Sequence, residues 1–129
     1  MILILKANTF IRKTSKNIGT SYFQVGANSA GASQTGAYTV GSNTQATVIG
    51  LSVSNVTGSA VDIDISLSAT MANTTNDVSL GSSIPLPSGS TVILVGGDQK
   101  LVLATADLIK VKSSAATSLD VVMSVLEIT

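Results

Sequence analysis

Residues 61–68 alternate strictly between apolar and polar side chains, and this period of two restricts the possible fold more than any other feature of the chain. The apolar positions are Val61, Ile63, Ile65 and Leu67. The polar positions are Asp62, Asp64, Ser66 and Ser68. Successive side chains of a β-strand point to opposite faces of its sheet. The segment is therefore predicted to be a strand with one buried face and one solvated face.

Similar short apolar segments recur from Gln45 to the end of the sequence, separated by turn signals. These signals are Asn55–Ser59, Ile84–Ser90 and Gly96–Gln99. No segment combines helical spacing with a helix-forming composition. Short strands separated by turns every 8–12 residues or so are typical of a sandwich or barrel. The prediction is an all-β fold, an antiparallel, jelly-roll-like β-sandwich of about eight strands over residues 45–129.

The apolar faces of these strands are predicted to form the core. Its predicted members are Ile49, Leu51, Val53, Val61, Ile63, Ile65, Leu67, Val92, Leu94, Leu101, Leu103, Ile109, Val111, Val121 and Met123. In the last strand, Leu119 and Val125 are predicted to face the same way as Val121 and Met123.

The chain carries unusually little charge, and from Asn17 to Val61 it carries none. Charged residues make up 11 % of the sequence, against roughly a quarter in ordinary soluble domains. The formal net charge is zero and the mean hydropathy is +0.48. Such a surface favours association. We therefore expect an assembly component, with the uncharged segment covered by other chains.

Residues 1–44 are predicted to form an extended N-terminal arm followed by a Gly/Ser-rich loop. Apolar residues alternate from Ile2 to Phe10, and four basic residues precede the first acid, Asp62. A free apolar strand pairs readily with the edge of another sheet. The predicted partner-binding arm consists of Ile2, Ile4, Lys6, Phe10, Arg12, Lys13 and Lys16. Deleting residues 1–16 is expected to leave a folded domain that no longer assembles.

The basic arm allows two interpretations. It could contact nucleic acid, but such surfaces normally add more cations and stacking aromatic residues. We therefore expect contact with an acidic subunit surface and no nucleic-acid partner. No window reaches the roughly 18 apolar residues of a membrane helix, so no membrane partner is expected either.

The sequence offers little for catalysis, because it contains no histidine and no cysteine. These residues supply the commonest general base, zinc ligands and nucleophile triads. Asp62 and Asp64 point to the same strand face and could contribute to a cation site, or they could simply be solvated. Calcium needs about six to eight oxygen ligands, and no further acids cluster beside them. We expect no enzyme activity, no cofactor and no metal.

Several motifs in the chain are similar to those of a known family. In the C-terminal half they are Ile84-Pro85-Leu86-Pro87-Ser88-Gly89, Val95-Gly96-Gly97-Asp98-Gln99-Lys100, Asp107-Leu108-Ile109-Lys110-Val111 and Ser124-Val125-Leu126-Glu127-Ile128. In the N-terminal half they are Arg12-Lys13-Thr14, Ile18-Gly19-Thr20 and Val48-Ile49-Gly50-Leu51. Together they resemble small virion structural proteins of tailed bacteriophages, particularly marine and cyanobacterial phages.

The resemblance implies a β-rich, non-enzymatic particle component present in many copies. It implies a location in the virion after assembly in the host bacterial cytoplasm, on the capsid, neck or tail. The long Gly/Ser-rich link over residues 26–44 departs from the family pattern and suggests an added arm that reaches a neighbour.

The leading hypothesis is a virion structural protein that decorates the capsid as a cement protein or forms part of the neck or tail. Its partners would be further copies of itself and other virion proteins. The alternative is a receptor- or glycan-binding module of a tail fibre or adhesin, and an enzyme is the third hypothesis.

Overall fold

The computed structural model describes residues 8–28, 35–71 and 74–129, and all regular secondary structure among them is β-strand. The strands are β1 (Asn8–Ile18), β2 (Phe23–Gln24), β3 (Gln45–Asn55), β4 (Val61–Met71), β5 (Thr74–Leu86), β6 (Thr91–Val95), β7 (Leu101–Leu103), β8 (Leu108–Ser113) and β9 (Leu119–Ile128). No helix among the described residues is long and apolar enough to cross a membrane.

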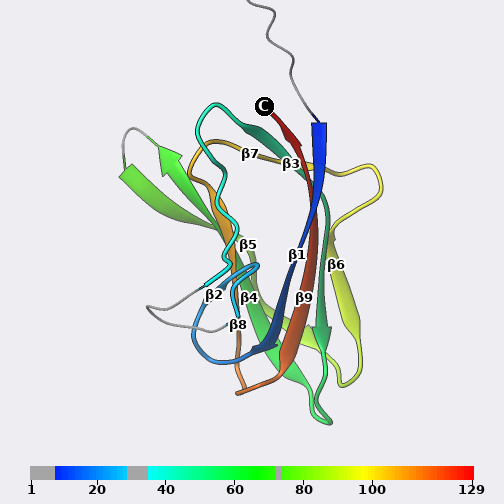
Figure 1. The fold of residues 1–129 in the computed structure, drawn as a ribbon. Helices are drawn as coiled ribbons and strands as arrows, with labels where there is room; N and C mark the ends of the chain where they lie inside the picture. Colours follow the sequence, from blue (N-terminus) through cyan, green and yellow to red (C-terminus); the bar gives the residue numbers. More distant parts are fainter. Residues whose placement is uncertain (1–7, 29–34, 72–73) are drawn as a thin grey trace, which may run out of the picture.

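Two antiparallel sheets pack face to face (Figure 1). Sheet A has the order β1-β9-β3-β6, with the short β7 also paired to β3, and sheet B has the order β2-β8-β4-β5. Without β7, the first strand pairs with the last, the second with the seventh, the third with the sixth and the fourth with the fifth. This nested pairing is that of a jelly roll. The predicted antiparallel, jelly-roll-like β-sandwich is confirmed.

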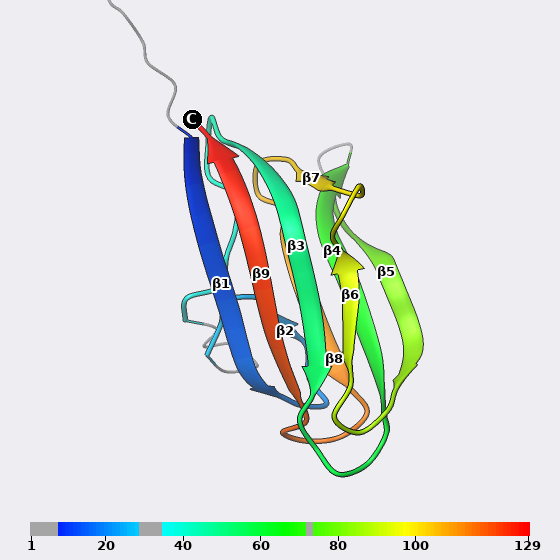
Figure 2. The same ribbon diagram turned by 90° about the vertical axis from the view of Figure 1, so that its right-hand side faces the viewer.

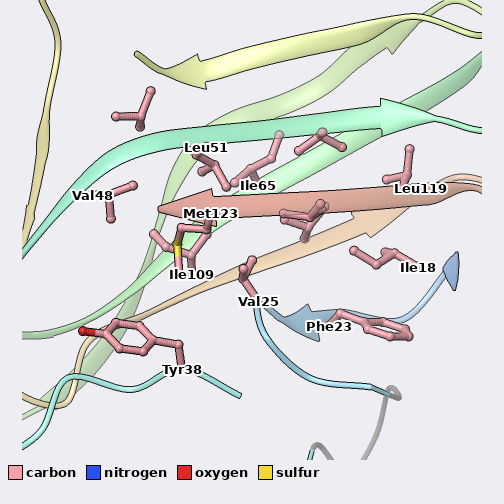
Figure 3. Packing of buried hydrophobic residues seen from close by; sticks show 14 of the residues in the cluster. Ile18, Phe23, Val25, Tyr38, Val48, Leu51, Ile65, Ile109, Leu119 and Met123 are labelled. Carbon is pink, nitrogen blue, oxygen red and sulfur yellow. The ribbon is translucent and has the colours of Figure 1, made fainter. Parts of the chain in front are cut away.

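The core lies between the sheets (Figure 3), and it contains the predicted apolar faces with one exception. Ile49 was expected to face inward with Leu51 and Val53, but it lies at a β-bulge where β3 changes its register against β9. The extra residue reverses the alternation. Ala46 and Val48 are therefore the buried residues before the bulge, and Leu51 and Val53 are buried after it.

The N-terminal region differs from the predicted arm. β1 pairs with β9 of its own chain from Asn8, opposite Ile128, to Ile18, opposite Leu119. Ile18 is fully buried in the core. The described part of residues 1–44 thus belongs to the sandwich, and residue 44 is not a domain boundary. Removing residues 1–16 would remove most of β1, so the deletion is now expected to destabilise the fold itself.

The Gly/Ser-rich segment is held by its own chain. The Val25 N–H donates to the Ile109 carbonyl at 2.8 Å, which continues the pairing of β2 with β8. The Tyr38 N–H donates to the Val25 carbonyl at 2.9 Å, and the Val40 N–H donates to the Asp107 carbonyl at 3.2 Å. Val25, Tyr38 and Val40 are buried as a result. The order of these residues requires no second chain.

Two glycines allow this segment to fold back on itself. A Cβ atom added at Gly26 would lie 2.7 Å from the Gly36 carbonyl oxygen, and one at Gly36 would lie 2.9 Å from the Gly26 carbonyl oxygen. Both residues have positive φ, 101° at Gly26 and 88° at Gly36. Glycine adopts such conformations without steric cost.

Gly26→Ala is expected to lower the free energy of unfolding by about 1–3 kcal/mol, because the new methyl group meets backbone at a strained φ. Urea unfolding measures the difference. Gly58→Ala is the matched control, since a Cβ atom there meets nothing within 4 Å. An equal effect of the two substitutions would contradict the structural role of Gly26.

Candidate interaction surface

The acidic residues offer no evident metal site. The described residues contain no group of three or more His, Cys, Asp and Glu side chains that could hold a metal ion. Asp64 Oδ1 accepts a hydrogen bond from the Ser83 N–H at 2.8 Å. Asp77, which could have joined Asp62 and Asp64, instead forms a 2.8 Å ion pair with Lys110.

The outer face of sheet B is polar, and Lys110, Lys112 and Asp77 on it interact with other side chains of the same face. Lys110 and Lys112 alternate with the buried residues of β8 and therefore point outward. Their Nζ atoms lie 5.0 Å and 4.9 Å from the centroid of the Tyr22 ring, within the range of cation–π attraction. Lys110 also pairs with Asp77. This face is suited to contact with water.

The outer face of sheet A carries most of the exposed large apolar side chains, interspersed with polar residues such as Thr47 and Ser52. The long strands β1, β9 and β3 and the shorter β6 lie side by side in it (Figure 2). The most exposed large apolar side chains on it are Phe10 at 74 %, Ile93 at 72 %, Val102 at 71 % and Val122 at 44 %. Ile49 and Leu126 are half-buried between them. Single exposed apolar residues are ordinary, whereas several on one sheet face, even with Ser52 and Thr47 between them, make that face a candidate interaction site. We call this surface the apolar face.

Two charged side chains border the centre of the apolar face. Arg12 lies opposite Ser124 on β9, and Asp120 lies four residues further along β9. Asp120 Oδ1 accepts a hydrogen bond from the Asn17 N–H at 3.1 Å. Within the described parts of the chain, neither Arg12 nor Asp120 has an ion-pair partner. Their charges are thus available to a partner.

A shallow hollow of about 220 Å³ opens on the same face. Phe10, Arg12, Ile49 and Ser124 contribute to its lining. The hollow lies beside the bulge of β3 at Ile49. Its size and lining suit an apolar side chain from another molecule.

The predicted partner-binding residues do not form one continuous arm. Phe10 and Arg12 lie on the apolar face. Lys13 is half-buried at the β1 edge, where its side chain approaches Gly26. Lys16 lines a separate hollow at that edge. Ile2, Ile4 and Lys6 lie outside the described residues. Contact of these seven residues with a partner stays a prediction.

Sequence reasoning missed the other residues of the apolar face. Ile93 lies within the run Thr91–Val95, and Val122 lies within Leu119–Val125. In both runs, apolar residues occupy successive positions and not only alternate ones. A strand without alternation has two apolar faces. This signal identifies both residues, whereas the inward-facing positions alone do not.

Tyr38 connects the Gly/Ser-rich segment to sheet A. Its hydroxyl donates a hydrogen bond to Glu127 Oε2 on β9, and its ring is part of the core (Figure 3). Burial raises the pKa of the Tyr38 hydroxyl well above its ordinary value, and the hydrogen bond and negative charge of Glu127 raise it further. The phenol therefore stays protonated and acts as a donor at neutral pH.

Tyr38→Phe is expected to lower the free energy of unfolding by about 1–3 kcal/mol at pH 7, because Glu127 loses its charge-assisted bond. A raised folded-state pKa contributes stability below the unfolded-state pKa of about 10, and that stability is lost as pH rises further. The advantage of the wild type over the variant should therefore shrink above pH 10. Urea unfolding at pH 7 and pH 10.5 tests this. A difference independent of pH would contradict it.

A second, larger hollow of about 760 Å³ lies beside β1. Its polar lining includes Thr14, Lys16, Asn17, Thr20 and Asn28. The only aromatic side chain among the described residues that line it is Phe23, which is buried. The hollow thus offers hydroxyl and amide groups without an exposed stacking platform.

Comparison with known proteins yields only distant similarities. No protein-family model matches the chain, and no curated protein matches it. Among solved structures, the chain is similar to a protein of the virus-like particle of the giant freshwater prawn Macrobrachium rosenbergii extra small virus. The identity is 10 %, the TM-score is 0.42, and the match covers 99 % of this chain and 82 % of that one.

The chain is also similar to a protein of the T13 IBDV viral particle, with 11 % identity and a TM-score of 0.43. That match covers 94 % of this chain and 34 % of the other, so this chain spans about a third of that protein's length. Similarities at this level do not assign a family.

Proposed function

We propose that the protein is a structural component of a virion, a bacteriophage particle in which it decorates the capsid or forms part of the neck or tail. The observation behind this proposal is the contrast between the two outer faces of the sandwich. Sheet A exposes Phe10, Ile93, Val102 and Val122, whereas sheet B exposes charged side chains, among them the Lys110–Asp77 ion pair. A module with one adhesive face and one solvated face is suited to coating or lining a larger assembly.

The fold and the sequence support the same role. Jelly rolls serve in viral capsid proteins, although lectins and cupins also use them, so the fold alone does not decide. The sequence motifs that resemble tailed-phage virion proteins favour the virion role over the other uses of this fold. The lack of histidine and cysteine removes the most common catalytic groups.

Assembly would rest on many weak contacts of the same kind. Each copy would bury apolar area at about 25 cal/mol per Å², and repetition over a particle would add avidity. Low net charge helps, because copies packed closely repel one another little.

The proposal is tested by mass spectrometry of particles purified from the virus that encodes the chain. Peptides of this protein should be present at many copies per particle and should survive washing in high salt, because apolar contacts are not screened. The major capsid protein of the same particles provides the internal standard. Absence from purified particles would overturn the proposal.

A receptor- or glycan-binding module is the second candidate, and the hollow beside β1 favours it. Hydroxyl and amide groups such as those of Thr14, Asn17 and Asn28 can hydrogen-bond a sugar. Glycan-array binding that Asn17→Ala abolishes would support this candidate. We rank it second because Phe23 is not exposed for stacking.

A further inference from the structure

We infer that the hollow beside Ile49 binds the free C-terminal residue of another protein chain, a residue with an apolar side chain next to its α-carboxylate. This inference deepens the proposed function and rests on it for the source of the partner chain in a particle. It depends on three features of the hollow: its shape, the Arg12 guanidinium at its rim and the Ser124 hydroxyl in its floor.

The hollow forms where small residues lie between large ones. On β9, Ser124 lies opposite Arg12 of β1 and opposite Gly50 of β3. A Cβ atom added at Gly50 would lie 4.0 Å from the Ser124 Cβ, so the two positions are neighbours on one face, and glycine leaves its position empty. Phe10 and Ile49 stand at the sides of this depression. A small floor between apolar walls can receive one apolar side chain.

The volume of the hollow limits its occupant to about one residue. It measures about 220 Å³, whereas sites for drug-sized molecules measure about 300–1,000 Å³. Because the hollow opens on the outer face of sheet A, the rest of a partner chain can leave it without meeting the sandwich. The single residue that fills it must therefore supply every group that the lining requires.

Arg12 requires a negative charge from that residue. Its side chain is exposed, and within the described residues it forms no ion pair. Asp120, an acid on the same face, lies four residues from Ser124 along β9, about 14 Å away, and accepts a hydrogen bond from the Asn17 N–H at 3.1 Å. A carboxylate is the group that a guanidinium binds through two parallel hydrogen bonds. A partner without one would cover Arg12 with its charge uncompensated, which is costly.

The Ser124 hydroxyl places this carboxylate at the hollow itself. The hydroxyl has no hydrogen-bond partner in the described part of the chain and can donate to a carboxylate. Opposite side chains on neighbouring antiparallel strands lie about 4.5–5.5 Å apart at Cβ, so Arg12 and Ser124 can hold one carboxylate between them. An acidic side chain on the same face of an extended partner would lie about 6.8 Å beyond the apolar residue. An α-carboxylate belongs to the residue in the hollow and can reach both groups.

The test is an NMR chemical-shift titration of the purified full chain with the peptide acetyl-Gly-Ser-Leu, which has a free C-terminal carboxylate, at millimolar concentrations. The backbone amides of Arg12, Gly50 and Ser124 should shift. The C-terminal amide of the same peptide lacks the charge and should bind about threefold to tenfold more weakly. Acetyl-Gly-Ser-Gly keeps the carboxylate but lacks the apolar side chain, and it should bind about tenfold more weakly.

Two variants separate the contributions of charge and shape. Arg12→Gln should weaken binding of the acid about threefold to tenfold and leave binding of the amide unchanged. Ser124→Leu should fill the hollow and abolish binding of both peptides. Lys112→Gln is the matched control, because it removes a cation from the outer face of sheet B, and it should have no effect. Thermal unfolding confirms that each variant is folded.

Equal binding of the acid and the amide would overturn the inference, and so would the absence of shifts at Arg12, Gly50 and Ser124. Shifts of equal size around Lys110 and Lys112 would show that the peptide is attracted to exposed cations in general, which would also overturn it. The titration uses the isolated chain, so its failure would leave the proposed function standing. Absence of the protein from purified particles would overturn the proposed function alone.

Discussion

Ile63→Ala should lower the free energy of unfolding by about 2–5 kcal/mol. Ile63 is 0 % exposed, and it lies on β4, opposite Ile84 of β5 and Ser113 of β8. With a partner strand on each side and sheet A across the core, the site cannot collapse around the missing atoms. The cavity therefore adds to the lost transfer free energy. Urea unfolding in dilute solution measures the effect.

Ile93→Ala is the control for this measurement. It removes the same atoms from a side chain that is 72 % exposed, so a change below about 0.5 kcal/mol is expected. A loss below about 1 kcal/mol for Ile63→Ala would show that β4 presents its other face to the core.

Asn55→Ala should lower the free energy of unfolding by about 2–4 kcal/mol, because one buried amide organises the loop between β3 and β4. The side chain is 2 % exposed. Its Nδ2 donates to the Ser59 and Leu86 carbonyls at 2.8 Å and 3.0 Å. Its Oδ1 accepts from the Thr57 N–H at 2.9 Å and from the Thr57 hydroxyl at 2.8 Å. The alanine variant leaves these partners without the amide.

Asn55→Asp separates the donor role from the acceptor role. A carboxylate keeps the bonds from Thr57 but faces two carbonyl oxygens that it cannot satisfy. The loss of stability of the aspartate variant, relative to wild type, should therefore be smaller at acidic pH than at neutral pH, because the neutral acid can donate a hydrogen bond. Asn8→Ala, at an exposed position of β1, should change stability by less than about 0.5 kcal/mol. Equal losses at Asn8 and Asn55 would contradict the role of the loop.

The strands after Gln45 could be predicted from the sequence because each has one clearly apolar face. Val61–Leu67 alternates without interruption, and Leu119–Val125 has an apolar residue at every second position; the structure buries these residues or packs them against the core. The exception at Ile49 follows from the bulge, which inserts one residue and has no compositional signature of its own beyond the adjacent Gly50.

The N-terminal strand could not be predicted in the same way. β1 is an edge strand of sheet A, and most of its residues are polar or charged because only a short part of it is buried. The inward-facing residues of β1 are set by its pairing with β9, which is about a hundred residues away in the sequence. The Gly/Ser-rich segment was interpreted from composition, and composition does not show that Gly26 and Gly36 make a close backbone contact.

The candidate surface could be predicted in part. Phe10 and Arg12 were selected because an apolar and basic segment near the N-terminus suggested a partner, and both lie on the apolar face. Val122 and Ile93 join them only through the order of strands in sheet A, which depends on pairing between distant segments. The pattern of residues along one strand identifies the two faces of that strand. A surface that several strands share can be identified only when the order of the strands in the sheet is known.

A density map of the intact particle tests the central claim most directly, because it locates the sandwich and shows which outer face is covered. We predict many copies of the sandwich, with the apolar face of sheet A, centred on Val122, against a neighbouring subunit. The outer face of sheet B, with Tyr22 between Lys110 and Lys112, should face solvent. A particle without the protein, or one in which Val122 faces solvent and the Tyr22 face is buried, would contradict the account.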